Sequence, residues 1–172
     1  MLQKIHRQLG IPVSYFQDTG MPIHAEAGKL VSIGLDISGR PQMLVPEAAK
    51  AWRSMELGAS REGVSLIIVS AFRSINYQAS LIKTKLDQGQ LIDDILRVNA
   101  APGYSEHHTG RAIDLTTPDC ELLCETFDKT DAFYWLRENA RKYNFTMSYP
   151  KNNNWGIDYE PWHWCYEHTL TG

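Results

Sequence analysis

One apolar run, VSLIIVSA from Val64 to Ala71, constrains the fold of this chain more than any other segment. Its β-branched residues and its length are typical of a central β-strand. The most apolar part, Leu66 to Val69, is far shorter than the roughly 20 residues that a membrane-spanning helix needs. The run therefore predicts the middle of a buried sheet.

The segments around this run predict a mixture of helices and strands. Pro46 suits a first helical turn, where its missing N–H costs nothing, and the Ser74 hydroxyl can cap the helix that follows it. The other predicted elements are strands at Leu30 to Ile37, Arg111 to Thr116 and Trp162 to Tyr166, helices at Pro46 to Ser60, Ile75 to Asp87, Leu91 to Val98 and Ala132 to Tyr143, and a loop at Asn99 to His108. Helices and strands without a regular βαβ repeat predict an α+β fold.

The 172 residues show no internal repeat and no linker, which predicts one domain over residues 1–172. Residues 1–45 are expected to form an irregular N-terminal wrap, because the first forty residues contain several Gly and Pro. The core of the domain is expected at residues 64–166.

Charge and targeting signals are weak. Seventeen basic and twenty acidic residues give a net charge of -3, which offers no electrostatic reason for a nucleic-acid or membrane partner. The first twenty residues carry charges among short apolar stretches and do not resemble a signal peptide. We therefore expect a cytoplasmic protein, or a periplasmic one if a leader has been removed. The odd number of cysteines, Cys120, Cys124 and Cys165, indicates reduced thiols.

The segment SEHHTGRAID, residues 105–114, places polar side chains beside very small ones. If the chain is extended after Gly110, Ala112 and Asp114 share one face with that glycine, which leaves room for an ion beside the carboxylate. His107 can fold back from the preceding loop towards Asp114. An imidazole and a carboxylate are both ordinary zinc ligands.

A third ligand is available in the segment YEPWHW, residues 159–164. Pro161 favours a break before a strand, and with Trp162 and Trp164 on one face of that strand His163 falls on the other. His107, Asp114 and His163 would then leave a fourth tetrahedral position for water. Three protein ligands with one open position are typical of a catalytic zinc, here one ion per chain.

Two further charged residues suit hydrolysis at such a metal. Glu160, three residues before His163, is a candidate general base that takes a proton from water and passes it to a departing amine. Arg73 follows the predicted central strand, where its guanidinium could hold a carboxylate or a developing oxyanion.

The pattern S-x-H-x-x-G-x-A-x-D followed by E-P-W-H resembles the VanY-type D-alanyl-D-alanine carboxypeptidases, which are related to the VanX dipeptidases and to the hedgehog fold. The residues that carry it are Ser105, His107, Gly110, Ala112, Asp114, Glu160 and His163. Ser70 to Ser74 together with Gln78 is similar to a second segment of the same family. The resemblance covers about Ser70 to Trp164.

The resemblance implies a hedgehog/DD-peptidase-like domain with a small antiparallel central sheet flanked by helices. It implies zinc on the two histidines and the aspartate, Glu160 as the base, and a peptidoglycan-derived peptide as substrate. Arg73, Gln78 and Ser105 would line the substrate pocket, and Trp162, beside the metal, would wall the cleft.

Each of these residues also has a structural interpretation. Glu160 could be a surface carboxylate, Arg73 a salt-bridge partner, and Gln78 and Ser105 could cap or brace loops. Trp162 could belong to the core, and His108 is expected in a supporting or loop position. His6, His24 and His168 are expected to be exposed or incidental.

Three functions fit the sequence. We favour an L,D-carboxypeptidase that removes the terminal D-alanine from tetrapeptides in murein recycling. A D,D-carboxypeptidase or D,D-dipeptidase acting on D-Ala-D-Ala termini would use the same residues. A zinc-containing binding module without activity is a more distant alternative, against which the presence of Glu160 and Arg73 speaks.

Overall fold

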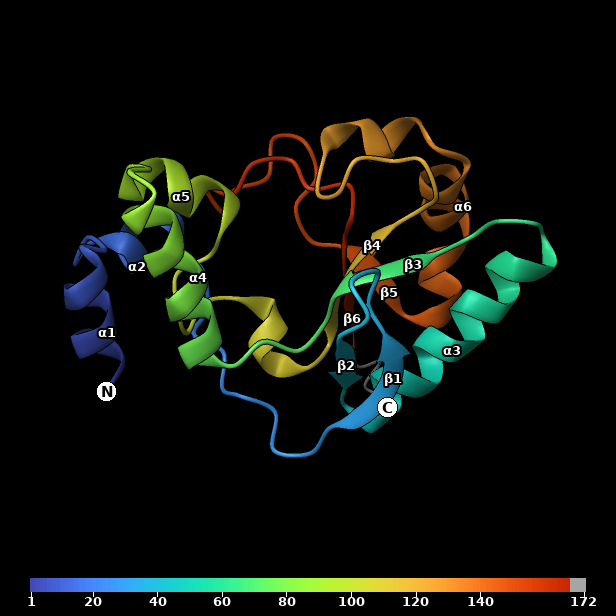
Figure 1. Ribbon diagram of the computed structural model, residues 1–172, viewed down its shortest axis with the longest axis horizontal. Helices are drawn as coiled ribbons and strands as arrows, with labels where there is room; N and C mark the ends of the chain where they lie inside the picture. The colour runs from blue at the N-terminus through green and yellow to red at the C-terminus, as the bar shows by residue number, and fades with distance from the viewer. Residues whose placement is uncertain (168–172) are drawn as a thin grey trace.

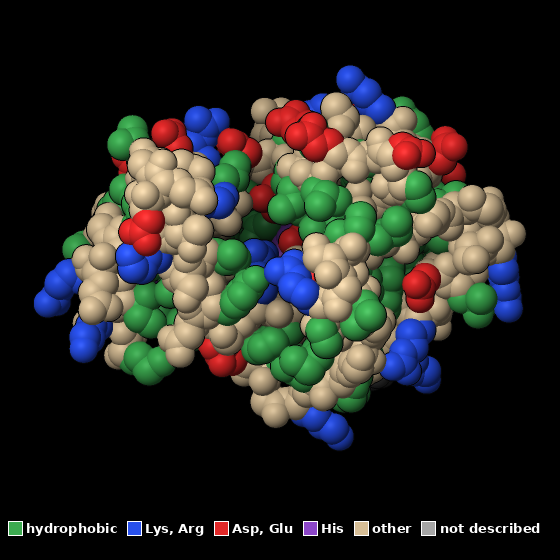
Figure 2. Space-filling view, in the orientation of Figure 1, with side chains coloured by type: hydrophobic (Ala, Val, Ile, Leu, Met, Phe, Trp, Pro, Cys, Tyr) green, Lys and Arg blue, Asp and Glu red, His purple; other side chains and the backbone are tan. Residues whose placement is uncertain are grey.

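A computed structural model describes residues 1–167, and the molecule has two halves with a hollow between them (Figures 1 and 2). The helical half contains α1 (Leu2–Leu9), α2 (Tyr15–Thr19), α4 (Ile75–Asp87) and α5 (Ile92–Val98). The sheet half contains β1 (Val31–Leu35), β2 (Pro41–Leu44), α3 (Pro46–Arg61), β3 (Ile67–Ser70), β4 (Ala112–Thr116), α6 (Asp131–Asn139), β5 (Phe145–Met147) and β6 (His163–Tyr166). Residues 1–167 also contain three 3-10 helices: η1 (Glu106–Thr109), η2 (Glu125–Lys129) and η3 (Ala140–Tyr143).

The main sheet has the strand order β3-β4-β6-β5, and every neighbouring pair is antiparallel. The small antiparallel sheet flanked by helices and the α+β class are confirmed. The register places Asp114 opposite Ser70 on one side and opposite His163 on the other. Three neighbouring strands thus bring polar residues into one row across the sheet.

The sheet half has its own hydrophobic core. The large side chains of Trp52 on α3, Leu115 on β4 and Phe145 on β5 are completely buried there, with Leu136 of α6. Helix α3 begins at Pro46 as the sequence predicts, because proline fits its first turn. Burial of this apolar surface is what holds α3 and α6 against the strands.

A second hydrophobic cluster stabilises the helical half. Ile82 of α4 and Ile95 of α5 are completely buried, and they pack with Leu9 and Tyr15 from the N-terminal helices. Ser74 caps α4, as predicted: its hydroxyl oxygen accepts a hydrogen bond from the backbone N–H of Tyr77 at 3.0 Å.

The N-terminal segment differs from its prediction. Residues 2–9 and 15–19 are helical, so an irregular wrap is the wrong description for them. Helix α1 ends where Gly10 adopts a left-handed conformation, φ 69°, which glycine tolerates without strain. Strand β2 and the three-residue strand β5 were not predicted, since neither contains the β-branched run that marks β3.

Two smaller predictions concern the cysteines and membrane-spanning segments. Cys120, Cys124 and Cys165 are free thiols, as expected. No helix within residues 1–167 has both the length and the apolar character needed to cross a membrane.

Candidate active site

Three predicted ligands come together at the edge of the hollow. His107 lies on η1, Asp114 in the middle of β4, and His163 is the first residue of β6. Each offers a ligand atom, and these atoms lie within 4.8 Å of one another. All three side chains are almost fully buried, between 1% and 4% exposed. The structure therefore assembles the group that the sequence predicts from one short segment, residues 107–114, and from His163, which lies 49 residues beyond Asp114.

The imidazole of His107 has a defined orientation. Its Nδ1 lies 2.5 Å from the carbonyl oxygen of Ala71 and donates to it, so Nε2 carries a lone pair. Within residues 1–167, Nε2 is buried and has no hydrogen-bond partner. It lies 3.2 Å from Oδ2 of Asp114, although the geometry there does not make a hydrogen bond. Two acceptors at this distance require a cation between them or beside them.

Gly110 explains part of the motif that carries His107. It ends η1 in a left-handed conformation, φ 64°. A Cβ at this position would lie 2.9 Å from the side chain of Leu30 and 3.1 Å from that of Ala27. Any other residue would therefore be strained and crowded, and the turn from η1 into β4 would shift.

The imidazole of His163 lies between two carboxylates. Its Nε2 lies 2.9 Å from Oε2 of Glu106, and its Nδ1 lies 2.9 Å from Oδ1 of Asp114. Glu106 also accepts a hydrogen bond from the hydroxyl of Ser148 at 2.6 Å. This arrangement aims Nδ1 at the same space as Nε2 of His107, and a carboxylate on the outer nitrogen is a common partner of a metal-binding histidine.

Without a metal, the charged groups of this cluster strongly shift one another's pKa values. Burial lowers the pKa of His163, but the hydrogen bonds that its ring donates to Asp114 and Glu106 outweigh burial and raise it to about 10. Burial raises the pKa of Glu106, but its hydrogen bond with His163 outweighs this and lowers it to about 2. The pKa of Asp114 is also lowered, because its interactions with both histidines outweigh its burial. A divalent cation would take the place of the proton that His163 holds.

The donor set fits zinc. Two imidazole nitrogens and one carboxylate are ordinary zinc ligands, and a tetrahedral ion with bonds of about 2.0–2.1 Å needs donors roughly 3.3 Å apart. Nδ1 of His163 lies 2.9 Å from Oδ1 of Asp114, and Nε2 of His107 lies 3.2 Å from the other carboxylate oxygen, Oδ2. The unpaired Nε2 of His107 is the specific observation that a metal would explain.

Glu160 lies beside this group. Its Oε2 is 3.9 Å from Nδ1 of His163, and its backbone N–H donates to the carbonyl of Tyr149 at 3.0 Å. The residue is 8% exposed, so a surface position is excluded. Burial, together with the negative charge of Asp114, outweighs the attraction of His163 and raises the pKa of Glu160 to about 7. A carboxyl group with such a pKa can both take and return a proton near neutral pH.

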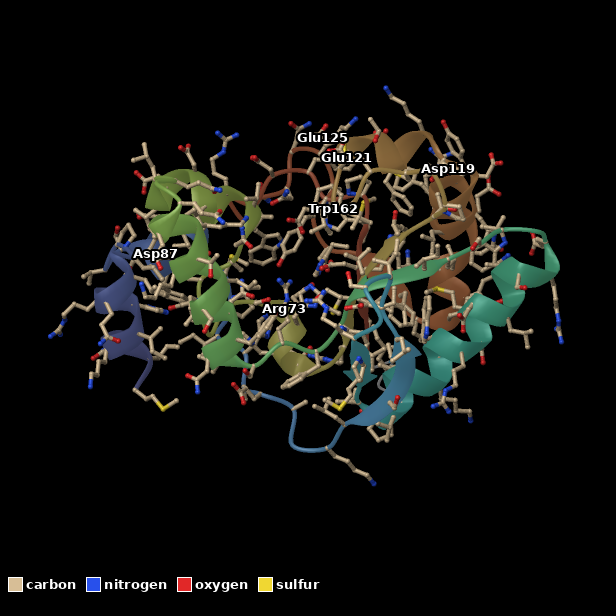
Figure 3. All side chains as sticks on the ribbon, viewed as in Figure 1. Arg73, Asp87, Asp119, Glu121, Glu125 and Trp162 are labelled. Carbon is tan, nitrogen blue, oxygen red and sulfur yellow. The ribbon has the colours of Figure 1, made fainter. Side chains whose placement is uncertain are left out.

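Arg73 lies on the segment between β3 and α4, near the centre of the molecule (Figure 3). Its Nη2 is 3.7 Å from Oδ2 of Asp114, and its backbone N–H donates to the carbonyl of His107 at 3.2 Å. Its Nε is buried and has no hydrogen-bond partner in the described part of the chain. The guanidinium therefore keeps donors available for an anion that enters the site.

A small cavity adjoins the cluster, with about 20 Å³ of room, about the space that one water molecule needs. Its walls are formed by Arg73, Val98, Asn99, Ala100, Ser105, His107, Tyr149, Ile157, Glu160 and His163. In the space-filling view, acidic and basic side chains meet where the hollow opens between the halves (Figure 2). Ser105 thus lies where the sequence predicts, and its hydroxyl oxygen accepts from the backbone N–H of His107 at 3.4 Å.

Gln78 and Trp162 lie outside the wall of this cavity. Gln78 is buried, and its side-chain amide donates to the carbonyl of Ala100 at 2.9 Å, so it supports the wall from behind. Trp162 is 9% exposed and belongs to the core of the sheet half, above Arg73 in the view of Figure 3. Their contact with a bound substrate stays a prediction.

The sequence prediction did not include Glu106 or Tyr149. The ring of Tyr149 lies 4.8 Å from that of His163 and forms one wall of the cavity. His6 and His24 are partly buried rather than exposed, and His168 lies outside the described residues. Glu106 could have been found from its place next to His107, whereas nothing in the sequence marks Tyr149.

His108 has a supporting position, as expected. Its Nδ1 donates to the carbonyl of Arg73 at 2.6 Å, and its Nε2 accepts from the backbone N–H of Gly103 at 3.0 Å. Both contacts require the neutral ring with the proton on Nδ1. Burial lowers the pKa of His108, which favours this neutral form.

Comparison with known proteins agrees with this geometry. The profile of the VanY family, described as D-alanyl-D-alanine carboxypeptidase, matches residues 41–169. The chain is 36% identical over 124 residues to the putative carboxypeptidase YodJ of Bacillus subtilis strain 168, covering 70% of this chain and 45% of the relative. It thus spans less than half the length of that protein.

Two solved structures share the fold. The LdcB LD-carboxypeptidase has a TM-score of 0.73 and 33% identity, covering 84% of this chain and 71% of that one. The D,D-dipeptidase VanXYg, solved with a D-Ala-D-Ala phosphinate analogue, has a TM-score of 0.69 and 29% identity, covering 87% and 60%. With its profile match over residues 41–169, its sheet and its buried His-Asp-His group, the chain belongs to the VanY family of D-alanyl-D-alanine carboxypeptidases.

Proposed function

We propose that this protein is a zinc-dependent carboxypeptidase that removes the C-terminal D-alanine from peptidoglycan stem peptides. The observation that carries the proposal is the unpaired Nε2 of His107, which faces the same space as Asp114 and Nδ1 of His163. Bound zinc supplies a Lewis acid and lowers the pKa of water towards about 7. His107, Asp114 and His163 would hold it.

Glu160 moves the proton in this proposal. Its buried carboxyl group has a pKa of about 7 without metal, so it accepts a proton from water at Oε2 and returns it to the departing amine. Its neighbour His163 cannot serve as the base, because both of its ring nitrogens already face carboxylates. Proton transfer therefore depends on Glu160.

Arg73 binds the anionic part of the substrate. Its unpaired, buried Nε donor and its Nη2 near Asp114 suit the terminal carboxylate of a peptide or the oxyanion that develops during attack. The backbone hydrogen bond from Arg73 to His107 fixes the backbone of Arg73 beside a metal ligand.

We favour L,D-specificity, in which the protein cleaves the bond of the tetrapeptide between an L-amino acid and the terminal D-alanine. The support is the likeness to the LdcB LD-carboxypeptidase, which is higher in both identity and TM-score than the likeness to the D,D-dipeptidase VanXYg. The alternative is a D,D-carboxypeptidase or D,D-dipeptidase on the pentapeptide, which would use the same residues.

The deciding experiment incubates the protein with purified tetrapeptide and pentapeptide and measures released D-alanine, with and without a chelator. We expect release from the tetrapeptide, loss of activity with the chelator and recovery with zinc. Release from the pentapeptide alone would contradict L,D-specificity. The absence of release from both peptides in the zinc-loaded protein would contradict the function itself.

A Glu160→Gln variant separates metal binding from turnover. We expect one zinc per chain by elemental analysis and a loss of turnover of at least about 1000-fold, because the base is removed while the ligands remain. A Glu160→Gln protein that keeps full activity would show that another group takes the proton.

A further inference from the structure

We propose that residues 2–27, the N-terminal clamp, hold the wall of the site cavity in place and thereby limit the size of the terminal residue that the protein accepts. The wall in question is the cavity loop, residues 99–108. The nature of the ligand rests on the proposed function, whereas the clamp itself rests on contacts in the structure. Residues 1–40 lie outside the range matched by the family profile, so family membership assigns no role to them.

Four hydrogen bonds connect the clamp to the cavity loop. The donors and acceptors are His6 Nε2 to the Pro102 carbonyl at 2.7 Å, the Ala101 N–H to the Tyr15 hydroxyl at 3.2 Å, the His24 N–H to the Gly103 carbonyl at 2.7 Å, and the Ala27 N–H to the His108 carbonyl at 2.8 Å. They fix three consecutive residues of the loop and its far end. Because buried backbone groups need partners, the loop relies on the clamp for polar contacts that the rest of the fold does not supply.

Packing reinforces these bonds at Tyr104 and Gly103. The ring of Tyr104 is 5.1 Å from that of Tyr15 in an edge-on arrangement and 5.8 Å from the stacked ring of His6. Gly103 has φ 91°, and a Cβ there would lie 2.6 Å from the side chain of Leu2. The backbone of the loop is therefore in direct contact with α1.

The same loop forms much of the cavity wall. Asn99, Ala100, Ser105 and His107 all line the cavity, as does Ile157. Gln78 holds the carbonyl of Ala100 from α4, while the clamp holds the next residues. With about 20 Å³ of room, a shift of the loop by a few tenths of an ångström changes the space available to a side chain.

A cavity this small and lined by Ala100, Val98 and Ile157 suits a methyl group better than a branched side chain. This matches a terminal D-alanine, whose carboxylate Arg73 would bind. Small apolar pockets discriminate against extra methylene groups by about 10- to 200-fold, and they do so only when their walls are rigid. The clamp supplies that rigidity in our proposal.

The test uses Tyr15→Phe, which removes one hydroxyl and leaves the Ala101 N–H without its acceptor. We expect KM for a D-Ala-terminated tetrapeptide to rise about fivefold, with kcat and zinc content within twofold of the wild type. The preference in kcat/KM for D-Ala over a D-Leu-terminated peptide should fall about tenfold. Phe16→Ala, at the neighbouring half-exposed position of α2, is the matched control and should leave all these values unchanged.

A lower melting temperature with an unchanged KM and an unchanged D-Ala preference would overturn the proposal, since Tyr15 would then only stabilise the fold. If Tyr15→Phe does not fold, His6→Ala breaks the bond to Pro102 and should give the same kinetic pattern. Unchanged kinetics in that variant would also overturn the proposal.

A second measurement does not depend on catalysis. The amide of Ala101 should exchange with deuterium at least about tenfold faster in Tyr15→Phe than in the wild type, while amides in β4 keep their protection. Unchanged exchange at Ala101 would contradict the clamp. A wild type that cleaves neither peptide would contradict the proposed function, and the exchange experiment would still decide whether the clamp exists.

Discussion

The two halves of the molecule contribute to the site in different ways. In the sheet half, Asp114 and His163 lie within paired strands, and the hydrogen-bond register sets their positions. In the helical half, the cavity wall is a loop that depends on side-chain contacts from α4 and from the N-terminal clamp. The sheet half therefore fixes two of the three predicted ligands, Asp114 and His163, whereas the helical half holds the loop that carries His107 and lines the cavity.

The largest effect should come from removing a ligand of the sheet half. Asp114→Asn keeps the size of the side chain but removes the charge that faces both histidines, so we expect zinc content to fall below about a tenth of an ion per chain. Activity should fall by more than about 1000-fold. Elemental analysis and D-alanine release measure the two quantities, and a variant that still binds one zinc would break the division between the halves.

The second effect concerns how the stability of the metal-free protein depends on pH. The pKa of Glu160 in the folded protein is about 7, raised from 4.5. Its contribution to the free energy of unfolding is therefore fully present below its pKa in the unfolded chain and is lost as pH rises through 7. The shift corresponds to about 3 kcal/mol at most. Chemical unfolding from pH 4 to pH 8 measures the free energy of unfolding of the wild type and of Glu160→Gln. The loss of stability with rising pH that Glu160 causes should be absent from the variant. Parallel curves for the two proteins would contradict the shift.

Glu106 gives the opposite sign over a lower range. Its folded pKa of about 2 lies below the ordinary value of 4.5, so the stability it contributes is present above 4.5 and is lost as pH falls towards 2. In the metal-bound state we expect Glu106→Gln to weaken zinc affinity by about 10- to 100-fold, because the partner of His163 Nε2 loses its charge. Competition with a chelator measures this. Ser148→Ala, which removes only the outer hydrogen bond, should have a smaller effect.

The smallest effect should come from removing one methyl group in each half. Ile113→Val in β4 and Ile82→Val in α4 remove the same group from two completely buried positions, and each should lower the free energy of unfolding by about 1 kcal/mol. We expect Ile113→Val alone to change zinc affinity, since Ile113 is next to Asp114. Equal changes in zinc affinity would show that the two halves are coupled more tightly than their separate clusters suggest.

The metal group could be predicted from sequence because its chemistry is local and restrictive. His107 and Asp114 lie only seven residues apart, and the left-handed turn at Gly110 between η1 and β4 brings the two side chains together. His163 needed only the alternation of faces in a short strand. The β3 strand and the cap at Ser74 were predictable for the same reason, because each depends on neighbouring residues.

Features that depend on distant partners could not be predicted. Tyr149 reaches the site through a loop whose path is set by tertiary packing, and Gln78 turned out to support Ala100 from behind rather than to line the cavity. The helices at the N-terminus are stabilised by burial of Leu9 and Tyr15 against the helical half. Short helices owe their stability to such packing more than to their own sequence.

The alignment of Ser70, Asp114 and His163 across three strands has a consequence for folding. Shifting either strand pair by one residue would turn Asp114 to the opposite face of the sheet and separate it from His163. A chain with the wrong strand register would then retain most of its hydrophobic surface but could not assemble the metal group. Uptake of zinc during refolding would therefore measure the fraction of molecules whose strands have paired in the correct register.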